Sequence, residues 1–158
     1  MTPAINTAKK AGIVFDVLEY SHDPANQHYG EEAAQKLGLS TAEVFKTLLV
    51  ALTGHTSTLA VAVLPVSHTL SLKAIAKALG AKKAEMADPT VAERTTGYLL
   101  GGISPLGQKK ALPTVIDVSA EALPRIHVSA GRRGLEIGLD PQDLCRLTRG
   151  NFAEIAAQ

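Results

Sequence analysis

A glycine-rich stretch, residues 97–110, has the residue types and spacing that could do chemistry. Four glycines and a proline fall within its first eleven residues, and it ends in the pair Lys109-Lys110. Glycine tolerates positive φ and carries no Cβ, so such a loop can direct bare N–H groups at an anion or at a developing oxyanion. The alternative is that the stretch forms a pair of ordinary surface turns.

The second candidate is Lys46, the only charged residue in a predicted strand over residues 45–52. Both faces of this strand are apolar, which indicates that both are covered. In one interpretation the lysine side chain snorkels to water. In the other, a half-buried ammonium lies beside a cleft, where it would meet an anion because burial without a partner is costly. The glycine-rich loop is then a candidate for the opposite wall.

Other recognisable catalytic sets are absent from the sequence. It contains no Cys-x-x-Cys, His-Glu-x-x-His or Gly-x-Ser-x-Gly pattern, and Gly101-Gly102 belongs to no nucleotide-binding fingerprint. His22 and His28 are not expected to bind a metal, and Cys145 is interpreted as a buried structural residue on a predicted helix. We therefore expect no metal and no cofactor. An enzyme of this sequence would depend on electrostatics, positioning and the substrate's own groups.

The composition is that of one ordinary globular domain. The chain has 158 residues, of which 46% are hydrophobic and 20% charged, and a net charge of +1. This charge is low for a dedicated nucleic-acid binder, but it suits a protein that touches only the end of an RNA or borrows RNA affinity from a partner. A single cysteine excludes an internal disulfide. With no apolar run of about 20 residues and no recognisable signal peptide, we expect a cytoplasmic protein without a membrane segment.

Strands and helices are predicted to mix without strict β-α-β alternation. A capping residue followed by proline starts helices at Thr2-Pro3, Asp88-Pro89 and Asp140-Pro141. Other helices are predicted over 31–37 and 72–79, with a further helical turn from 40 to 43, and strands over 13–20, 45–52, 59–64, 83–86, 114–118, 125–129 and 135–139. This order favours a mixed α/β (α+β) fold, with a curled, barrel-like mixed sheet surrounded by short helices.

Several stretches resemble the YbaK family, the free-standing relatives of the editing domain inserted in bacterial prolyl-tRNA synthetases. The matching stretches are FKTLLV (45–50), KKAEMAD (82–88), TGY (96–98), GGISPLGQKK (101–110) and SAGRRG (129–134), together with the opening MTPA and the HDP at 22–24. The resemblance covers almost the whole chain. It implies a single YbaK-type aminoacyl-tRNA editing domain over residues 1–158.

The resemblance implies an aminoacyl-tRNA deacylase, of the hydrolase or lyase class, that removes cysteine from mischarged Cys-tRNA(Pro). Cys-tRNA(Cys) is a further candidate substrate, and prolyl-tRNA synthetase is a candidate partner. A proline pocket cannot strongly reject a side chain of similar size, so charging errors need a second sieve. Lys46 matches the family's essential lysine, and Gly101 lies in its substrate-binding loop. Other positions that match the family's pocket are Tyr20, Tyr29, Thr47, Gly102, Ile103, Ser129 and Glu136.

Three positions depart from the family's pattern. Ala130 stands where glycine is expected, so this position should not need positive φ. Glu136 replaces an expected aspartate, and its extra methylene could move the carboxylate or shrink the pocket, while Tyr29 replaces a phenylalanine. Two alternatives to the cysteine-specific deacylase therefore stay open. One is an editing enzyme of different amino-acid specificity, and the other is a non-catalytic module that binds tRNA or the synthetase.

Overall fold

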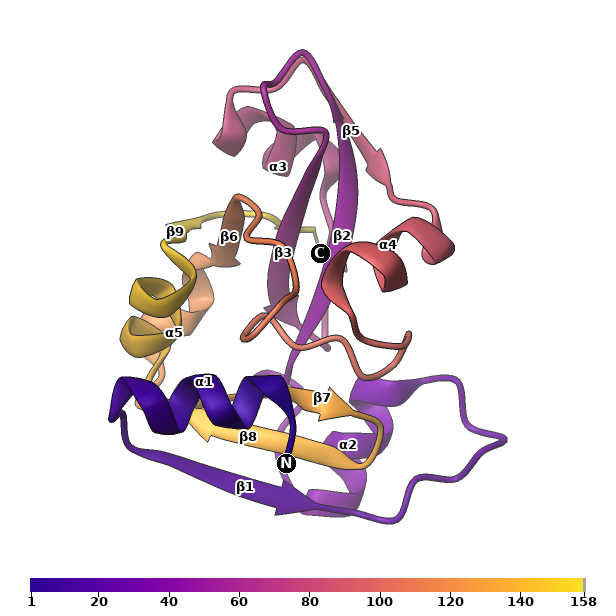
Figure 1. The fold of residues 1–158 in the computed structure, drawn as a ribbon, viewed down its shortest axis with the longest axis vertical. Helices are drawn as coiled ribbons and strands as arrows, with labels where there is room; N and C mark the ends of the chain where they lie inside the picture. The colour runs from indigo at the N-terminus through magenta and orange to yellow at the C-terminus, as the bar shows by residue number, and fades with distance from the viewer. Residues whose placement is uncertain (158) are drawn as a thin grey trace.

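The computed structural model describes residues 1–157, and their strands form three sheets (Figure 1). The largest sheet has the strand order β5-β2-β3-β6-β9, in which β2 pairs antiparallel with β3 and β5, whereas β6 pairs parallel with β3 and β9. Its strands are β2 (Phe45–Thr53), β3 (Leu59–Pro65), β5 (Lys83–Met86), β6 (Thr114–Asp117) and β9 (Asn151–Ala153). The mixed sheet expected from the sequence is therefore confirmed.

A second, antiparallel sheet has the strand order β1-β8-β7. Its strands are β1 (Phe15–Glu19), β7 (Ile126–Arg132) and β8 (Leu135–Leu139), while β4 (Thr69–Leu70) and β10 (Ala156–Ala157) form a small third sheet. An isolated bridge between Val44 and His127 links the start of β2 to β7. Within residues 1–157 the sheets do not close into one hydrogen-bonded barrel, so the curled sheet is only barrel-like in layout.

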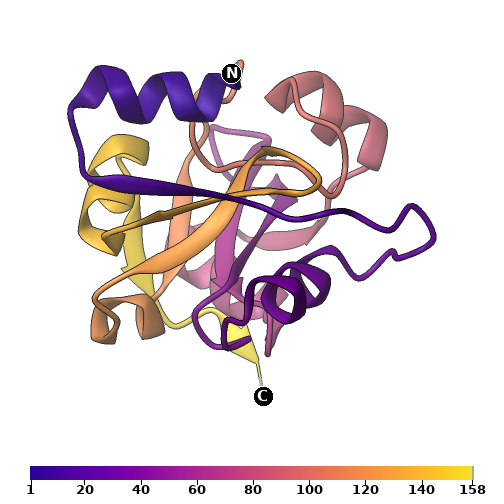
Figure 2. The same cartoon turned by 90° about the horizontal axis from the view of Figure 1, so that it is seen from below.

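Five α-helices lie outside the sheets within the described part of the chain (Figures 1 and 2). They are α1 (Pro3–Ala11), α2 (Tyr29–Leu37), α3 (Leu72–Leu79), α4 (Pro89–Thr96) and α5 (Pro141–Thr148), and a short 3-10 helix, η1, covers Val118–Ala122. The three expected cap-plus-proline starts are confirmed, because the side chains of Thr2, Asp88 and Asp140 each accept a backbone N–H of the first turn. None of these helices is long and apolar enough to cross a membrane.

The helical turn expected at residues 40–43 is only a hydrogen-bonded turn. The N–H of Ser40 donates to Glu43 Oε1 at 3.0 Å, and Ser40 Oγ accepts the N–H of Ala42 at 3.1 Å, so part of a capping pattern is present. The chain then passes at once into β2 at Phe45. No helix follows this turn, because strand pairing takes over the backbone hydrogen bonds from Phe45 onward.

Strand β2 passes between two hydrophobic clusters, as its apolar faces indicated. Phe45 and Leu49 pack into the larger cluster, with residues of β7 and β8 such as Val128 and Ile137. Val50 and Leu52 point to the other face, where Ile75 of α3 covers them. A strand enclosed on both faces is a rigid support for the few polar side chains that it carries.

Candidate active site

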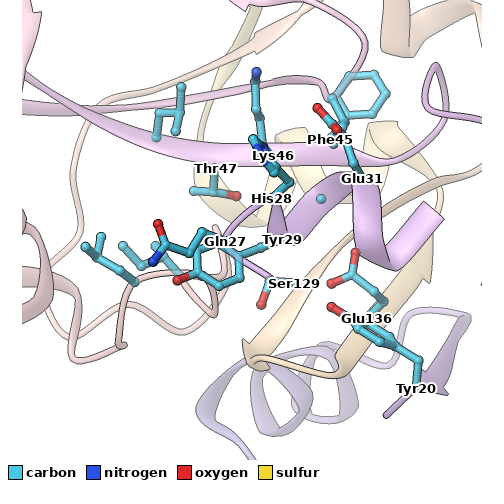
Figure 3. Close-up of a pocket in the computed structure, with 16 residues that line it drawn as sticks. Tyr20, Gln27, His28, Tyr29, Glu31, Phe45, Lys46, Thr47, Ser129 and Glu136 are labelled. Atoms are coloured by element: carbon cyan, nitrogen blue, oxygen red, sulfur yellow. The ribbon is translucent and has the colours of Figure 1, made fainter. Parts of the chain in front are cut away.

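A cavity of about 370 Å³ lies where β2, α2, the glycine-rich loop and the β7–β8 hairpin meet (Figure 3). It gathers residues from widely separated parts of the sequence. Eight of the nine residues expected at the site line it: Tyr20, Tyr29, Lys46, Thr47, Gly101, Ile103, Ser129 and Glu136. The ninth, Gly102, is not among the lining residues.

The β7–β8 hairpin brings Ser129 and Glu136 together. They are directly paired in the antiparallel register, so both side chains leave the same face of the sheet. Ser129 Oγ accepts the N–H of Gly131 at 3.2 Å, which leaves its own hydroxyl proton for a ligand. The ladder shifts register between Ser129 and Arg132. Gly131, with φ of 112°, rather than Ala130, adopts the left-handed backbone at this irregularity, so alanine fits at position 130.

Glu136 is a buried carboxyl group without a partner inside the described part of the chain. Its residue is only 6% exposed, and no hydrogen bond or ion pair reaches its carboxyl from residues 1–157. Burial raises the pKa of Glu136 to about 8. Figure 3 shows the carboxyl and the Tyr20 hydroxyl pointing toward one another at one end of the cavity. Burial, and then the charge of Glu136, raise the pKa of Tyr20 to about 12, so this phenol stays protonated.

Lys46 and Thr47 leave β2 on opposite faces, as successive strand residues must. In Figure 3 Thr47 points to the side of β2 on which Ser129 and Glu136 lie, whereas the Lys46 amine points to the other side. Both residues line the cavity, which therefore extends around the strand. The expectation of a half-buried ammonium beside a cleft is met, but in this structure the amine does not point at the buried acid.

The two β2 side chains also differ in their electrostatics. Burial lowers the pKa of Lys46, and the neighbouring Glu31 carboxylate works against that shift. Thr47 Oγ1 is buried and has no hydrogen-bond partner among the described residues. An unsatisfied buried hydroxyl is destabilising, and its place in the lining leaves the Thr47 hydroxyl open to a ligand.

The glycine-rich loop contributes three expected site residues, Gly101, Gly102 and Ile103, and two of them have a free backbone N–H within residues 1–157. The N–H of Gly102 is used inside the loop, because it donates to the carbonyl oxygen of Leu99 at 2.9 Å. A Cβ on Gly102 would lie 2.7 Å from the Arg132 backbone, which explains why glycine is needed there. The N–H groups of Gly101 and Ile103 have no acceptor within residues 1–157. The geometry thus gives Gly102 a structural place in the turn and leaves its neighbours as donors.

Sequence reasoning missed several residues of this site. Gln27, His28 and Glu31 also line the cavity and lie outside the matching stretches, whereas Leu100 lies in the glycine-rich stretch but was not expected at the site. Tyr98, read only as part of a motif, is buried and donates its hydroxyl to the Leu106 carbonyl at 2.7 Å, which fixes the loop. Within residues 1–157 no group of three or more His, Cys, Asp or Glu side chains is arranged to bind a metal ion.

Comparisons with known proteins agree on a family. The family model described as "Aminoacyl-tRNA editing domain" matches residues 24–147. A protein of Enterococcus faecalis, "Putative Cys-tRNA(Pro)/Cys-tRNA(Cys) deacylase EbsC", is 42% identical over 141 residues, which are 89% of this chain and 85% of that protein.

Two solved structures have the same fold. The crystal structure of "hypothetical protein APE2540" has a TM-score of 0.85 at 22% identity, over 99% of this chain and 100% of that one. The crystal structure of "a putative trans-editing enzyme for prolyl tRNA synthetase" has a TM-score of 0.83 at 21% identity, over 100% and 99% of the two chains.

Proposed function

The chain belongs to the aminoacyl-tRNA editing domain family, and on this premise we propose that it removes cysteine from mischarged Cys-tRNA(Pro). Cys-tRNA(Cys) is the second proposed substrate, since the related enterococcal protein carries both in its name. The observation that carries the proposal is that Lys46, Gly101 and Glu136 line one cavity, and that the Gly101 N–H and the Glu136 carboxyl have no partner within residues 1–157. The proposed catalytic unit is one editing domain over residues 1–158.

The aminoacyl end of the tRNA carries groups that match the cavity on both sides of β2. The N–H groups of Gly101 and Ile103 would donate to the ester carbonyl oxygen as it gains negative charge. The α-ammonium would lie against Glu136, which would give up its proton to meet a cation. Lys46, on the other side of β2, would hold the terminal ribose-phosphate of the tRNA and stabilise the negative charge that develops at the ester.

The cavity offers no side chain that is an obvious nucleophile, and the substrate brings its own. A cysteine thiol is a few per cent thiolate near neutral pH and is intrinsically nucleophilic. In the proposed route, the sulfur attacks the carbonyl carbon of its own residue to form a C–S bond. The ester C–O bond breaks, and the thiol proton ends on the 3′-terminal oxygen of the released tRNA. The protein supplies position and charge stabilisation.

A comparison of Cys-tRNA(Pro) with Ser-tRNA(Pro) tests this route. The hydroxyl of serine is a far weaker nucleophile than the cysteine thiol, so we expect serine to be released much more slowly. Equal deacylation rates would rule out attack by sulfur and require water as the nucleophile.

A different amino-acid specificity is the second candidate function, and Glu136 favours it because its carboxyl reaches further into the cavity than an aspartate would. A panel of aminoacyl-tRNAs measured with the wild type decides between the two. If no member of the panel is deacylated while tRNA still binds, the protein is a binding module rather than an enzyme.

The proposed partner that presents the tRNA is prolyl-tRNA synthetase. The net charge of +1 gives this chain little general attraction for the RNA backbone. We expect the tRNA affinity to rise when the synthetase is added, as measured by fluorescence anisotropy of labelled tRNA. The cytoplasm is the proposed location, because these substrates are found there.

A further inference from the structure

Arg133, at the turn between β7 and β8, makes two contacts with the site without lining its cavity. Its Nε donates to the carbonyl oxygen of Leu100 at 2.8 Å. Its Cζ lies 4.8 Å from the centroid of the Tyr29 ring, in a cation–π arrangement. The residue is exposed, and no carboxylate within residues 1–157 forms an ion pair with it.

Gly101 is enclosed between the two partners of this stack. A Cβ at position 101 would lie 2.7 Å from Arg133 Nε and 2.8 Å from two carbons of the Tyr29 ring, and its φ is 83°. Only glycine fits such a position. The arginine, the tyrosine ring and the loop therefore form one packed unit, in which displacement of the arginine would loosen the peptide between Leu100 and Gly101.

The hydrogen bond to Leu100 also fixes the direction of a catalytic group. The carbonyl of Leu100 and the N–H of Gly101 belong to one planar peptide unit, and in a trans peptide they point in opposite directions. Arg133 holds the carbonyl oxygen on its own side, so the Gly101 N–H is turned away from Arg133. The N–H groups on either side are already used, by Glu93 Oε2 for Leu100 and by the Leu99 carbonyl for Gly102.

We propose that Arg133 is a positioning residue for deacylation, which orients the Gly101 N–H toward the substrate carbonyl by holding the Leu100 carbonyl. This inference rests on the proposed function, because it assigns the N–H to the ester oxygen. Arg133 touches neither the ester nor the amino acid. Its contribution is to prevent the peptide plane between Leu100 and Gly101 from flipping.

The test compares Arg133→Ala with Arg132→Ala, its exposed neighbour, whose side chain makes no hydrogen bond to the loop. With Cys-tRNA(Pro) as substrate, we expect Arg133→Ala to lower kcat by about 10- to 100-fold with little change in KM, because the donor is misplaced rather than removed. Arg132→Ala keeps the wild-type kcat. Arg133→Lys keeps the charge but loses the planar fork, and we expect it to recover only part of the kcat.

Hydrogen exchange of peptides that cover residues 97–106 gives a second readout, which needs no activity. We expect faster exchange in Arg133→Ala than in Arg132→Ala. Equal exchange in the two variants overturns the proposal, as does faster exchange with unchanged kcat. A raised KM that Arg133→Lys fully restores also overturns it, since the arginine would then only attract RNA. If the wild type deacylates nothing, the proposed function fails, whereas the exchange result still decides whether Arg133 holds the loop.

Discussion

Glu32 and Glu136 are both buried glutamates, but the surrounding protein shifts their pKa values in opposite directions. Glu32, on α2, accepts hydrogen bonds from His22 Nδ1 at 2.6 Å, from the N–H of Asp23 at 2.8 Å and from Lys36 Nζ at 3.1 Å. Burial alone would raise the pKa of Glu32, but these hydrogen bonds and the nearby charge of His22 outweigh it and lower the pKa to about 2. Glu136 has no such donors among the described residues 1–157, and burial raises its pKa to about 8.

The contrast separates an acid whose oxygens are bonded within the protein from an acid whose oxygens are left free in a cavity. Glu32 ties the segment after β1, which projects outward in Figures 1 and 2, to the helix that begins with Tyr29. Its hydrogen-bonding capacity is used within the protein. Glu136 faces a cavity with its capacity unused, although an unpaired buried acid lowers stability. Such a cost is characteristic of functional sites.

The largest predicted effect is on stability, at Glu32. Glu32→Ala leaves Lys36 and the Asp23 N–H without their partner, and we expect a loss of about 3 kcal/mol in the free energy of unfolding. The matched control is Glu31→Ala, an exposed neighbour on the same helix, expected to change stability by less than about 0.5 kcal/mol. Urea denaturation at pH 7 measures both. Equal losses of unfolding free energy in the two variants would show that the hydrogen bonds of Glu32 do not stabilise the fold.

A smaller effect of opposite sign is predicted for Glu136. Between its unfolded pKa of 4.5 and its folded pKa of about 8, the folded protein keeps a proton that the unfolded chain has lost. Wild-type stability therefore falls as pH rises through this window. Glu136→Gln removes the titration, and we expect it to gain on the order of 2 kcal/mol relative to wild type between pH 5 and pH 8. Urea denaturation at several pH values across this window measures the difference. Parallel pH curves for the two proteins would contradict the assignment of a buried, unpaired acid.

The features of the fold and the site that could be predicted from sequence are local. The cap at Thr2, the proline starts at Asp88 and Asp140 and the two-faced apolar pattern of β2 depend on neighbouring residues, and the structure has all of them. The resemblance to a family supplied half of the residues that line the cavity. The position of Ala130 outside the left-handed region also followed from residue type alone.

The parts that could not be predicted depend on contacts between distant segments. No sequence pattern shows that the Gly102 N–H is used by the Leu99 carbonyl, or that Thr47 rather than Lys46 points to the side of β2 on which Ser129 and Glu136 lie. The stack of Arg133 on Tyr29 joins residues that are far apart in the chain. Among residues 1–157 one isolated bridge, between Val44 and His127, links β2 of the large sheet to β7 of the second sheet. This single bridge does not merge the two sheets into one, and no sequence pattern predicts it.

The most direct test of the account is the deacylation of Cys-tRNA(Pro) by wild type, Lys46→Ala and the control Lys73→Ala, an exposed lysine on α3. Binding of tRNA is measured in parallel. The account predicts that Lys46→Ala loses about 100-fold in kcat, the scale of a lost charge-stabilising group, while tRNA affinity and the control stay close to wild type. Wild-type turnover by Lys46→Ala would contradict the claim that this cavity is the editing centre.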